Sequence, residues 1–312
     1  MIKTVGLIGA GSVGSGLISQ MYAADCENVY VLAKGERAER FRQKGISVNN
    51  DVIYPNVYSD KDQNIDLDVL IVASKTYSLE QTAEDFADLI NQDTIIIPIQ
   101  NGIMATEKLR RRFPENRVLY GIVVRTDAHR MGRRVYFNTL GEMQIGYADN
   151  REMKPEVQQV YDRLRALGVN VTVCEDMRRA QWLKWMLNIG GSQVAAETHV
   201  ECGFFGQVEE IRRIMELCME EVVEIAKAEG VNVTQQDCDE IIDFLIDYPP
   251  DKKMSMLQDL EAGRPIEIDE YAGTVIQLGK KHGIPTPANE MLNLTINARR
   301  KVDAMRKHVT WN

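Results

Sequence analysis

Short apolar runs alternate with helical patterns through the first half of the chain. The apolar, β-branched runs predict strands over residues 4–8, 29–32, 69–72, 94–97 and 118–124. Apolar side chains at helical spacing predict helices between them, over residues 13–24, 36–44, 79–91 and 105–113. Because strands that alternate with helices form parallel sheets covered on both faces, this half predicts an α/β, doubly wound sheet.

The pattern changes after residue 174. Before that point, residues 134–137 and 142–145 flank a turn-like segment and predict a hairpin, and a helix over 155–167 and a strand over 171–174 complete the first half. Beyond it the periodicity predicts only helices, over residues 177–199, 208–229, 235–248, 252–262, 269–282 and 288–309. We therefore expect a sheet domain over residues 1–174 and an all-α domain over residues 175–312.

The first predicted strand runs directly into a glycine-rich segment that a helix follows at once. This segment reads Gly9, Ala10, Gly11, Ser12, Val13 and Gly14. In such turns the first glycine allows the sharp bend, the second lets backbone approach a pyrophosphate, and the third lets helix and strand pack closely. The segment predicts a Rossmann-type dinucleotide-binding domain; a glycine-rich turn of another α/β protein is the alternative.

The end of the second predicted strand bears on the choice of cofactor. Domains specific for NAD usually place an acidic residue there to bind the ribose 2′-hydroxyl. Here Lys34 and Arg37 occupy this place, with Glu36 between them. Two cations favour the 2′-phosphate of NADP, whereas Glu36 would serve an NAD site. A solvated helix start is the alternative for both cations.

Charge and cysteine content narrow the classes of partner and compartment. The net charge of −9 disfavours broad binding to nucleic acids or anionic membranes, which need basic surfaces. The five cysteines form no CxxC pair, so we expect reduced thiols, no metal site and a cytoplasmic protein. Apolar residues over 208–229 and 269–309 are compatible with a homodimer interface or with an internal core.

A polar stripe runs along the first helix of the predicted second domain. Lys184, Asn188 and Ser192 are four residues apart and lie on one face of a helix. Trp182 and Trp185 flank the lysine on other faces, so we expect Lys184 to be partly buried among polar neighbours. A solvated surface lysine is the alternative.

Five stretches in order resemble the ketopantoate reductase family over nearly the whole chain. They are GAGSVG at 9–14, ASKTY at 73–77, QNG at 100–102, WLKWMLN at 182–188, and SMLQD at 255–259 followed by PIEID at 265–269. The resemblance implies an NADPH-dependent oxidoreductase that reduces 2-dehydropantoate to pantoate, a step of pantothenate and coenzyme A biosynthesis.

The resemblance also implies roles for single residues of the second domain. Lys184 matches the family's proton donor, and Glu267 matches the glutamate that contacts both the cofactor and the catalytic lysine. Asn188 and Ser255 match groups that hold the hydroxyl and the carboxylate of the substrate. A small 2-oxo acid is therefore the expected partner.

Two further matches lie in the first domain, and two departures lie in the second. Lys75 and Asn101 match residues beside the cofactor ribose and nicotinamide, with Asn101 also near the substrate. Many members carry asparagines where this chain has Ser192 and Cys202. Ser192 can still hydrogen-bond a substrate, whereas a thiol does so weakly.

These departures keep two alternatives open. The chain could reduce a different 2-oxo acid or ketone, or it could be a non-catalytic sensor of NADP. A sensor would need only the glycine turn and its neighbouring cations, so the joint presence of the lysine stripe and Glu267 favours an enzyme.

Overall fold

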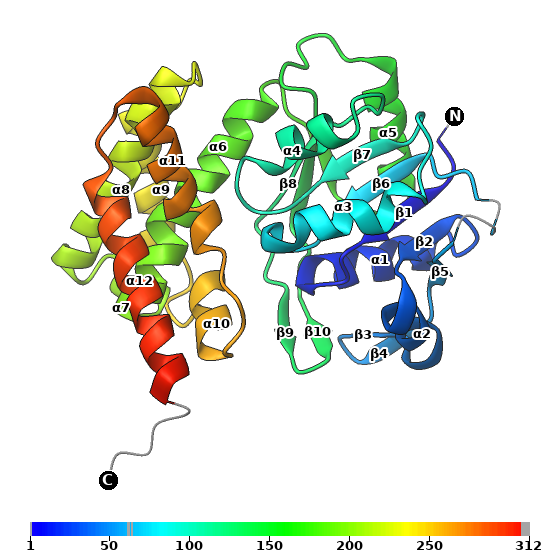
Figure 1. The fold of residues 1–312 in the computed structure, drawn as a ribbon, viewed down its shortest axis with the longest axis horizontal. Coiled ribbons are helices and arrows are strands. Elements are labelled where there is room, and N and C mark those ends of the chain that lie inside the picture. The colour runs from blue at the N-terminus through cyan, green and yellow to red at the C-terminus, as the bar shows by residue number, and fades with distance from the viewer. Residues whose placement is uncertain (1, 61–62, 64, 307–312) are drawn as a thin grey trace. The chain divides into compact units, whose positions relative to one another are not determined.

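The computed structural model of the chain describes residues 2–60, 63 and 65–306 (Figure 1). Packing divides the chain into two compact units, Met1–Gln181 and Trp182–Asn312. The division falls inside helix α6 (Met177–Leu187). The place with the fewest contacts between two units is not always the end of an independently folding domain. The predicted domain boundary between residues 174 and 175 therefore stays a prediction.

A parallel sheet forms the centre of the first unit. Its strands, in spatial order, are β5 (Asn56–Tyr58), β2 (Val29–Leu32), β1 (Val5–Ile8), β6 (Val69–Val72) and β7 (Ile95–Pro98). Every neighbouring pair is parallel, and Val5 of the central strand pairs with Val29 on one side and Val69 on the other. This arrangement confirms the predicted doubly wound sheet.

Helices cover both faces of this sheet, which explains why its central strands are almost wholly apolar. Leu7 and Ile71 pack into one core cluster with helices α1 (Ser12–Ala24) and α5 (Pro155–Ala166). Ile8 and Leu70, which point the other way, pack with helices α3 (Leu79–Ala87) and α4 (Ala105–Arg112). Alternate residues of each strand thus supply two cores.

Two smaller sheets and a further helix complete the first unit. One sheet has the order β12 (Val171–Val173), β11 (Glu142–Gly146) and β8 (Tyr120–Val124). The other has the order β4 (Asp51–Ile53), β3 (Ile46–Val48), β10 (Arg134–Tyr136) and β9 (His129–Met131). Helix α2 (Gly35–Lys44) follows β2, and a short 3₁₀ turn, η2 (Thr76–Ser78), precedes α3.

The predicted hairpin around residues 138–141 is wrong. Strands β10 and β11 belong to different sheets, where β10 pairs with β9 and β11 with β8. Asp127 explains the difference, because its carboxylate accepts hydrogen bonds from the backbone N–H groups of Asn138 and Thr139. The polar segment is folded onto Asp127 and does not close a two-stranded turn.

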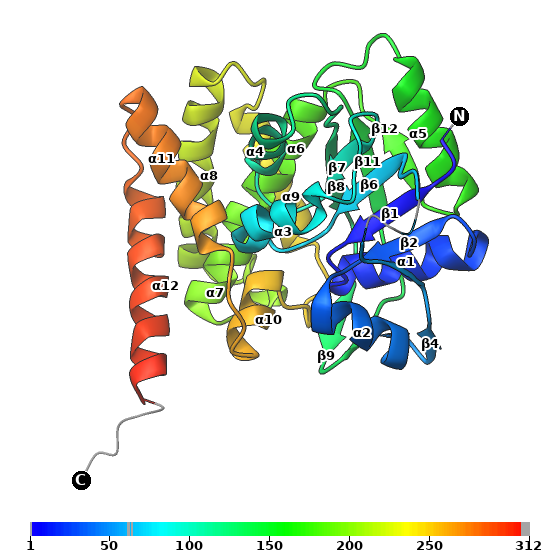
Figure 2. The same cartoon turned by 45° about the vertical axis from the view of Figure 1, so that its right-hand side comes forward.

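The second unit is helical, as predicted. After α6 come the π-helix η3 (Asn188–Gln193), α7 (Val194–Thr198), the 3₁₀ turn η4 (Cys202–Phe204), α8 (Glu209–Ala228), α9 (Gln235–Ile246), α10 (Ser255–Glu261), the 3₁₀ turn η5 (Ile268–Glu270), α11 (Ala272–His282) and α12 (Pro287–Arg306). Helices α8, α11 and α12 pack together (Figure 2). The predicted end of the last helix at residue 309 lies outside the described residues. Within those residues, no helix combines the length and apolarity that a membrane span requires.

The continuous helix predicted over residues 177–199 is interrupted by a π-helix. The wider turn contains Gly190 and Gly191, and a methyl group added to Gly190 would collide with the side chain of Met219 on α8. Glycine at this position therefore lets Met219 of α8 pack directly against the π-helix. Turns of this kind often occur at functional sites, and this one begins at Asn188.

Candidate active site

The glycine turn of the first unit has the geometry expected of a phosphate-binding loop. Gly9 adopts a φ of +99°, and a side chain there would collide with the backbone at Ser74. Gly11 is the N-cap of α1, and a methyl group added to it would meet nothing closer than the Gly9 carbonyl oxygen at 3.9 Å. The protein thus leaves space at Gly11, beside the N-terminus of a helix, where an anion is favoured.

Two loops that follow the carboxyl ends of neighbouring strands in the same sheet are hydrogen-bonded to each other. The Thr76 hydroxyl, after β6, donates to the carbonyl of Asn101, after β7, at 3.2 Å. Gln100 donates to the hydroxyl of Ser74 at 3.1 Å. These bonds bring the segments of Lys75 and Asn101 together at the edge where open α/β sheets bind ligands.

Lys34 and Arg37 both lie at the carboxyl end of β2. Lys34 is the N-cap of α2 and Arg37 lies in its first turn, as does Glu36. Both cationic side chains are exposed, and the Lys34 ammonium lies 3.8 Å from the Asp88 carboxylate. An exposed ion pair of this kind contributes little to stability, so an incoming phosphate can compete for the lysine.

One arginine near the glycine turn was not predicted from the sequence. The Arg130 guanidinium, on β9, donates a hydrogen bond of 2.8 Å to the carbonyl of Ala10 in the glycine turn. Strand β9 has only three residues and was not predicted, so nothing local showed that Arg130 reaches the turn. The cluster of basic residues over 130–134 was the only available signal.

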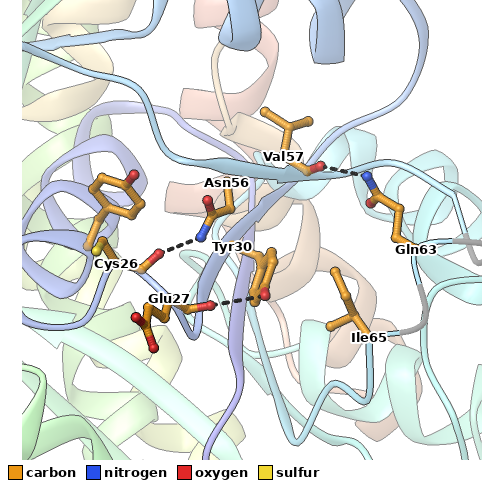
Figure 3. A pocket seen from close by; sticks show the side chains of 8 residues that line it. Cys26, Glu27, Tyr30, Asn56, Val57, Gln63 and Ile65 are labelled. Carbon is orange, nitrogen blue, oxygen red and sulfur yellow. Dashed lines mark hydrogen bonds between the residues drawn. The ribbon is translucent and has the colours of Figure 1, made fainter.

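A hollow of about 770 Å³ lies elsewhere in the first unit, at the opposite, amino-terminal edge of the sheet (Figure 3). Tyr22, Tyr30 and Asn56 are among its lining residues. Asn56 donates to the carbonyl of Cys26 and the Tyr30 hydroxyl donates to that of Glu27 (Figure 3). The hollow lies away from the glycine turn, so it does not belong to the predicted cofactor site.

In the second unit, Lys184 and Glu267 form the electrostatic centre of the candidate site. Lys184 is half-buried in α6. Trp182 and Trp185 flank it in the sequence, and their ring centroids lie 5.2 Å apart in an edge-to-face arrangement. Trp185 donates to the backbone carbonyl of Glu270 at 2.8 Å, which ties α6 to the segment that carries Glu267. Glu267 is 6% exposed.

This environment adjusts the acidity of the lysine. Burial lowers the pKa of Lys184 to about 8, and the Glu267 carboxylate opposes part of that shift. An amine with a pKa of about 8 can both donate and accept a proton near neutral pH, which suits an acid–base catalyst.

The stripe continues from Lys184 into the π-helix. Asn188 is 7% exposed, and its side-chain N–H₂ group has no hydrogen-bond partner. The Ser192 hydroxyl is fully buried and lies 3.3 Å from that of Ser255, which begins α10 and is exposed. The structure therefore brings together Ser192 with Ser255, and Lys184 with Glu267, as a functional role would require.

Cys202, one of the two departures, is buried. Its backbone N–H donates to the carbonyl of Lys252 at 2.9 Å. Burial raises the pKa of the Cys202 thiol to about 11, so it stays protonated at neutral pH. It is a poor substitute for an asparagine that hydrogen-bonds a ligand.

The fold and these residues define a Rossmann-type, dinucleotide-binding protein whose helical second unit carries a lysine-centred polar cluster. The family model of ketopantoate reductase PanE/ApbA matches residues 5–150, and the model of the same family's C-terminal part matches residues 176–300. The chain therefore belongs to the ketopantoate reductase family, and it is an oxidoreductase that uses a nicotinamide cofactor.

Individual relatives are distant but match over nearly their full length. The 2-dehydropantoate 2-reductase of Halobacterium salinarum is 26% identical over 286 residues, which cover 89% of this chain and 93% of the relative. A ketopantoate reductase structure from Ralstonia eutropha JMP134 has a TM-score of 0.83 at 24% identity and covers 96% of this chain and 98% of its own. A D-mandelate dehydrogenase structure with NADH has a TM-score of 0.84 at 20% identity, with coverages of 96% and 99%.

Proposed function

We propose that the protein reduces 2-dehydropantoate to pantoate with NADPH, a step of pantothenate and coenzyme A biosynthesis. Family membership supports reduction of a 2-oxo acid, and the name of the Halobacterium relative supports this particular substrate. The single observation that carries the proposal is the half-buried Lys184, with a pKa of about 8, under the influence of the buried Glu267.

The chain's own residues account for the acid–base part of the reaction. When bound, the nicotinamide cofactor supplies the hydride. Negative charge then grows on the ketone oxygen of the substrate, where the Lys184 ammonium stabilises it and delivers a proton. Glu267 favours the charged lysine against the cost of burial. Asn188, Ser192 and Ser255 orient the substrate.

The residues that we assign to the cofactor, apart from Glu267, lie in the first unit. We assign the phosphates to the glycine turn, the ribose 2′-phosphate to Lys34 and Arg37, and the region of the nicotinamide and its ribose to Lys75 and Asn101. The open space at Gly11 fits a pyrophosphate, since a side chain there would occupy it. We add Arg130 because its guanidinium already lies at the glycine turn.

An assay of NADPH oxidation with 2-dehydropantoate and a panel of other 2-oxo acids tests this function. Preferred turnover of 2-dehydropantoate supports it. A better substrate in the panel would favour the alternative that Ser192 and Cys202 raise, a reductase of another 2-oxo acid or ketone. Cofactor binding without any turnover would indicate a non-catalytic NADP sensor.

Replacing Arg37 by alanine is expected to raise the KM for NADPH about tenfold and to leave that for NADH unchanged. The guanidinium would pair with the 2′-phosphate, which NADH lacks, and a charge-assisted bond is worth about 1.5–3 kcal/mol. Steady-state kinetics with both cofactors measures this. Arg40→Ala, an exposed arginine of the same helix, is the control. Equal changes for both cofactors would remove Arg37 from the 2′-phosphate site.

Replacing Arg130 by alanine is expected to weaken NADPH binding about tenfold. The change removes both a positive charge beside the phosphates and the hydrogen bond to the Ala10 carbonyl. Titration of cofactor fluorescence gives the Kd. The exposed Arg133→Ala serves as control, because Arg133 carries the same charge on the neighbouring turn. An unchanged Kd would show that Arg130 stabilises the glycine turn and does not contact the cofactor.

We also propose that the chain is cytoplasmic and forms a homodimer through α12. Its five cysteines are free thiols. Met291, Leu294, Val302 and Met305 form an apolar stripe on α12 and are 44–66% exposed. Spacings of three, eight and three residues keep the stripe on one side of the helix, so a second copy presents a matching surface across a twofold axis.

Replacing Leu294 by glutamate is expected to reduce the molar mass in solution to about half, since each copy would bring a charge into the apolar contact. Light scattering after size-exclusion chromatography measures the mass. Gln277→Glu, which places the same charge on an exposed position of α11, is the control. A wild-type protein that is already monomeric would refute the dimer.

A further inference from the structure

Tyr271 is a buried residue of the second unit whose hydroxyl is not satisfied. It lies between η5 and α11, its side chain is 0% exposed, and its Oη atom makes no hydrogen bond of regular length and angle. A buried polar group without a partner is costly, so native proteins rarely leave one without a reason. Packing alone would be served equally well by phenylalanine.

The surroundings of this hydroxyl belong to the candidate site. Ser255 lies within range of a weak hydrogen bond to the Tyr271 phenol, and its hydroxyl lies 3.3 Å from the hydroxyl of Ser192. These contacts place three hydroxyl-bearing side chains next to one another. Burial, reinforced by the carboxylates of Glu267 and Asp259, holds the pKa of Tyr271 well above its ordinary value. The phenol is therefore neutral and keeps a proton to donate.

A second unsatisfied group of the same kind lies on the stripe. The side-chain nitrogen of Asn188 is a buried donor without a partner, like the Tyr271 hydroxyl. Each of these donors would be satisfied by a ligand that offers a hydrogen-bond acceptor. A carboxylate offers about four acceptor positions and no donor, whereas a hydroxyl would bring a donor of its own.

We propose that the Tyr271 hydroxyl donates a hydrogen bond to the carboxylate of the 2-oxo acid and, beside Ser255, determines specificity for an acid over a neutral ketone. This proposal rests on the proposed function. Ser255 is exposed and so gives a ligand a way to reach the buried hydroxyls. Lys184 then remains available for the ketone oxygen.

The variant Tyr271→Phe separates this role from a purely structural one. It removes only the hydroxyl, so it is expected to melt at the same temperature as the wild type or slightly higher. Calorimetry in the presence of NADP⁺, which cannot reduce a ketone, gives the Kd for 2-dehydropantoate. We expect that Kd to rise about tenfold, which corresponds to about 1.4 kcal/mol. Tyr248→Phe, the loss of a phenolic hydroxyl elsewhere in the unit, should leave it unchanged.

A matched pair of ligands tests the preference for the carboxylate. With 3-methyl-2-oxobutanoate and its methyl ester, Tyr271→Phe should weaken binding of the acid about tenfold and that of the ester less than about twofold. The proposal would be overturned if Tyr271→Phe bound 2-dehydropantoate and 3-methyl-2-oxobutanoate as tightly as the wild type does, even if the wild type reduces 2-dehydropantoate. A wild type that neither binds nor reduces any 2-oxo acid would overturn both this proposal and the proposed function.

Discussion

Replacing Lys184 by alanine is expected to lower kcat for 2-oxo acid reduction about 10³-fold while the Kd for NADPH stays within about twofold. In the proposed mechanism the change removes both the proton donor and the positive charge that stabilises the growing oxyanion, and general acids alone contribute about 10²- to 10⁴-fold. Cofactor binding should survive because the residues assigned to the phosphates lie in the first unit. Single-turnover kinetics and cofactor titration measure the two quantities.

Lys280→Ala provides the matched control, since Lys280 is an exposed lysine of the same unit. A melting curve of each variant checks that the fold is intact. Removing a partly buried amine should not destabilise the protein greatly, because burial already disfavours its charged form. Parallel losses of NADPH affinity and turnover would contradict the division of roles between the two units.

Replacing Glu267 by glutamine is expected to lower kcat/KM for reduction at least about tenfold at pH 7.5, and to move the alkaline limb of the pH profile to lower pH. The Glu267 carboxylate raises the pKa of Lys184 against the larger, opposite effect of burial. Without that negative charge the lysine loses its proton at lower pH, so less ammonium is present at any given pH. Initial rates between pH 6 and pH 10 give the profile.

Glu261→Gln is the control for this change. Glu261 pairs with Lys253 at the surface and is not part of the lysine cluster. Its replacement should leave both the rate and the profile as they are. If Glu267→Gln lowered the rate equally at every pH, the carboxylate would act by holding the cofactor or the fold and not by tuning Lys184.

The parts of the fold that were predictable from the sequence are those with strong local patterns. Strands β2 and β6 are buried apolar runs that end where the sequence predicts, and the helix after the glycine turn begins one residue early. Strands β3, β4 and β9 have three residues each and carry polar side chains. Their pairing depends on partners far along the chain, so no local period reveals them.

The candidate site likewise combines features that the sequence predicts with features that depend on tertiary structure. The grouping of Lys184, Asn188 and Ser192 by their spacing of four stays a prediction, and the π-helix that begins at Asn188 was not foreseen. That turn depends on the packing of Gly190 against Met219, which is nearly thirty residues away in sequence. The contact of Arg130 with the glycine turn and the unsatisfied hydroxyl of Tyr271 are likewise products of tertiary structure.

The pH dependence of the wild-type enzyme in both directions tests the central claim, that Lys184 is the acid for reduction and the base for the reverse oxidation. Reduction needs the ammonium, so its kcat/KM should fall as pH rises through about 8, the pKa of Lys184. Oxidation of pantoate needs the neutral amine, so its kcat/KM should rise through the same value. Profiles that run in the same direction, or that show no group titrating near pH 8, would contradict it.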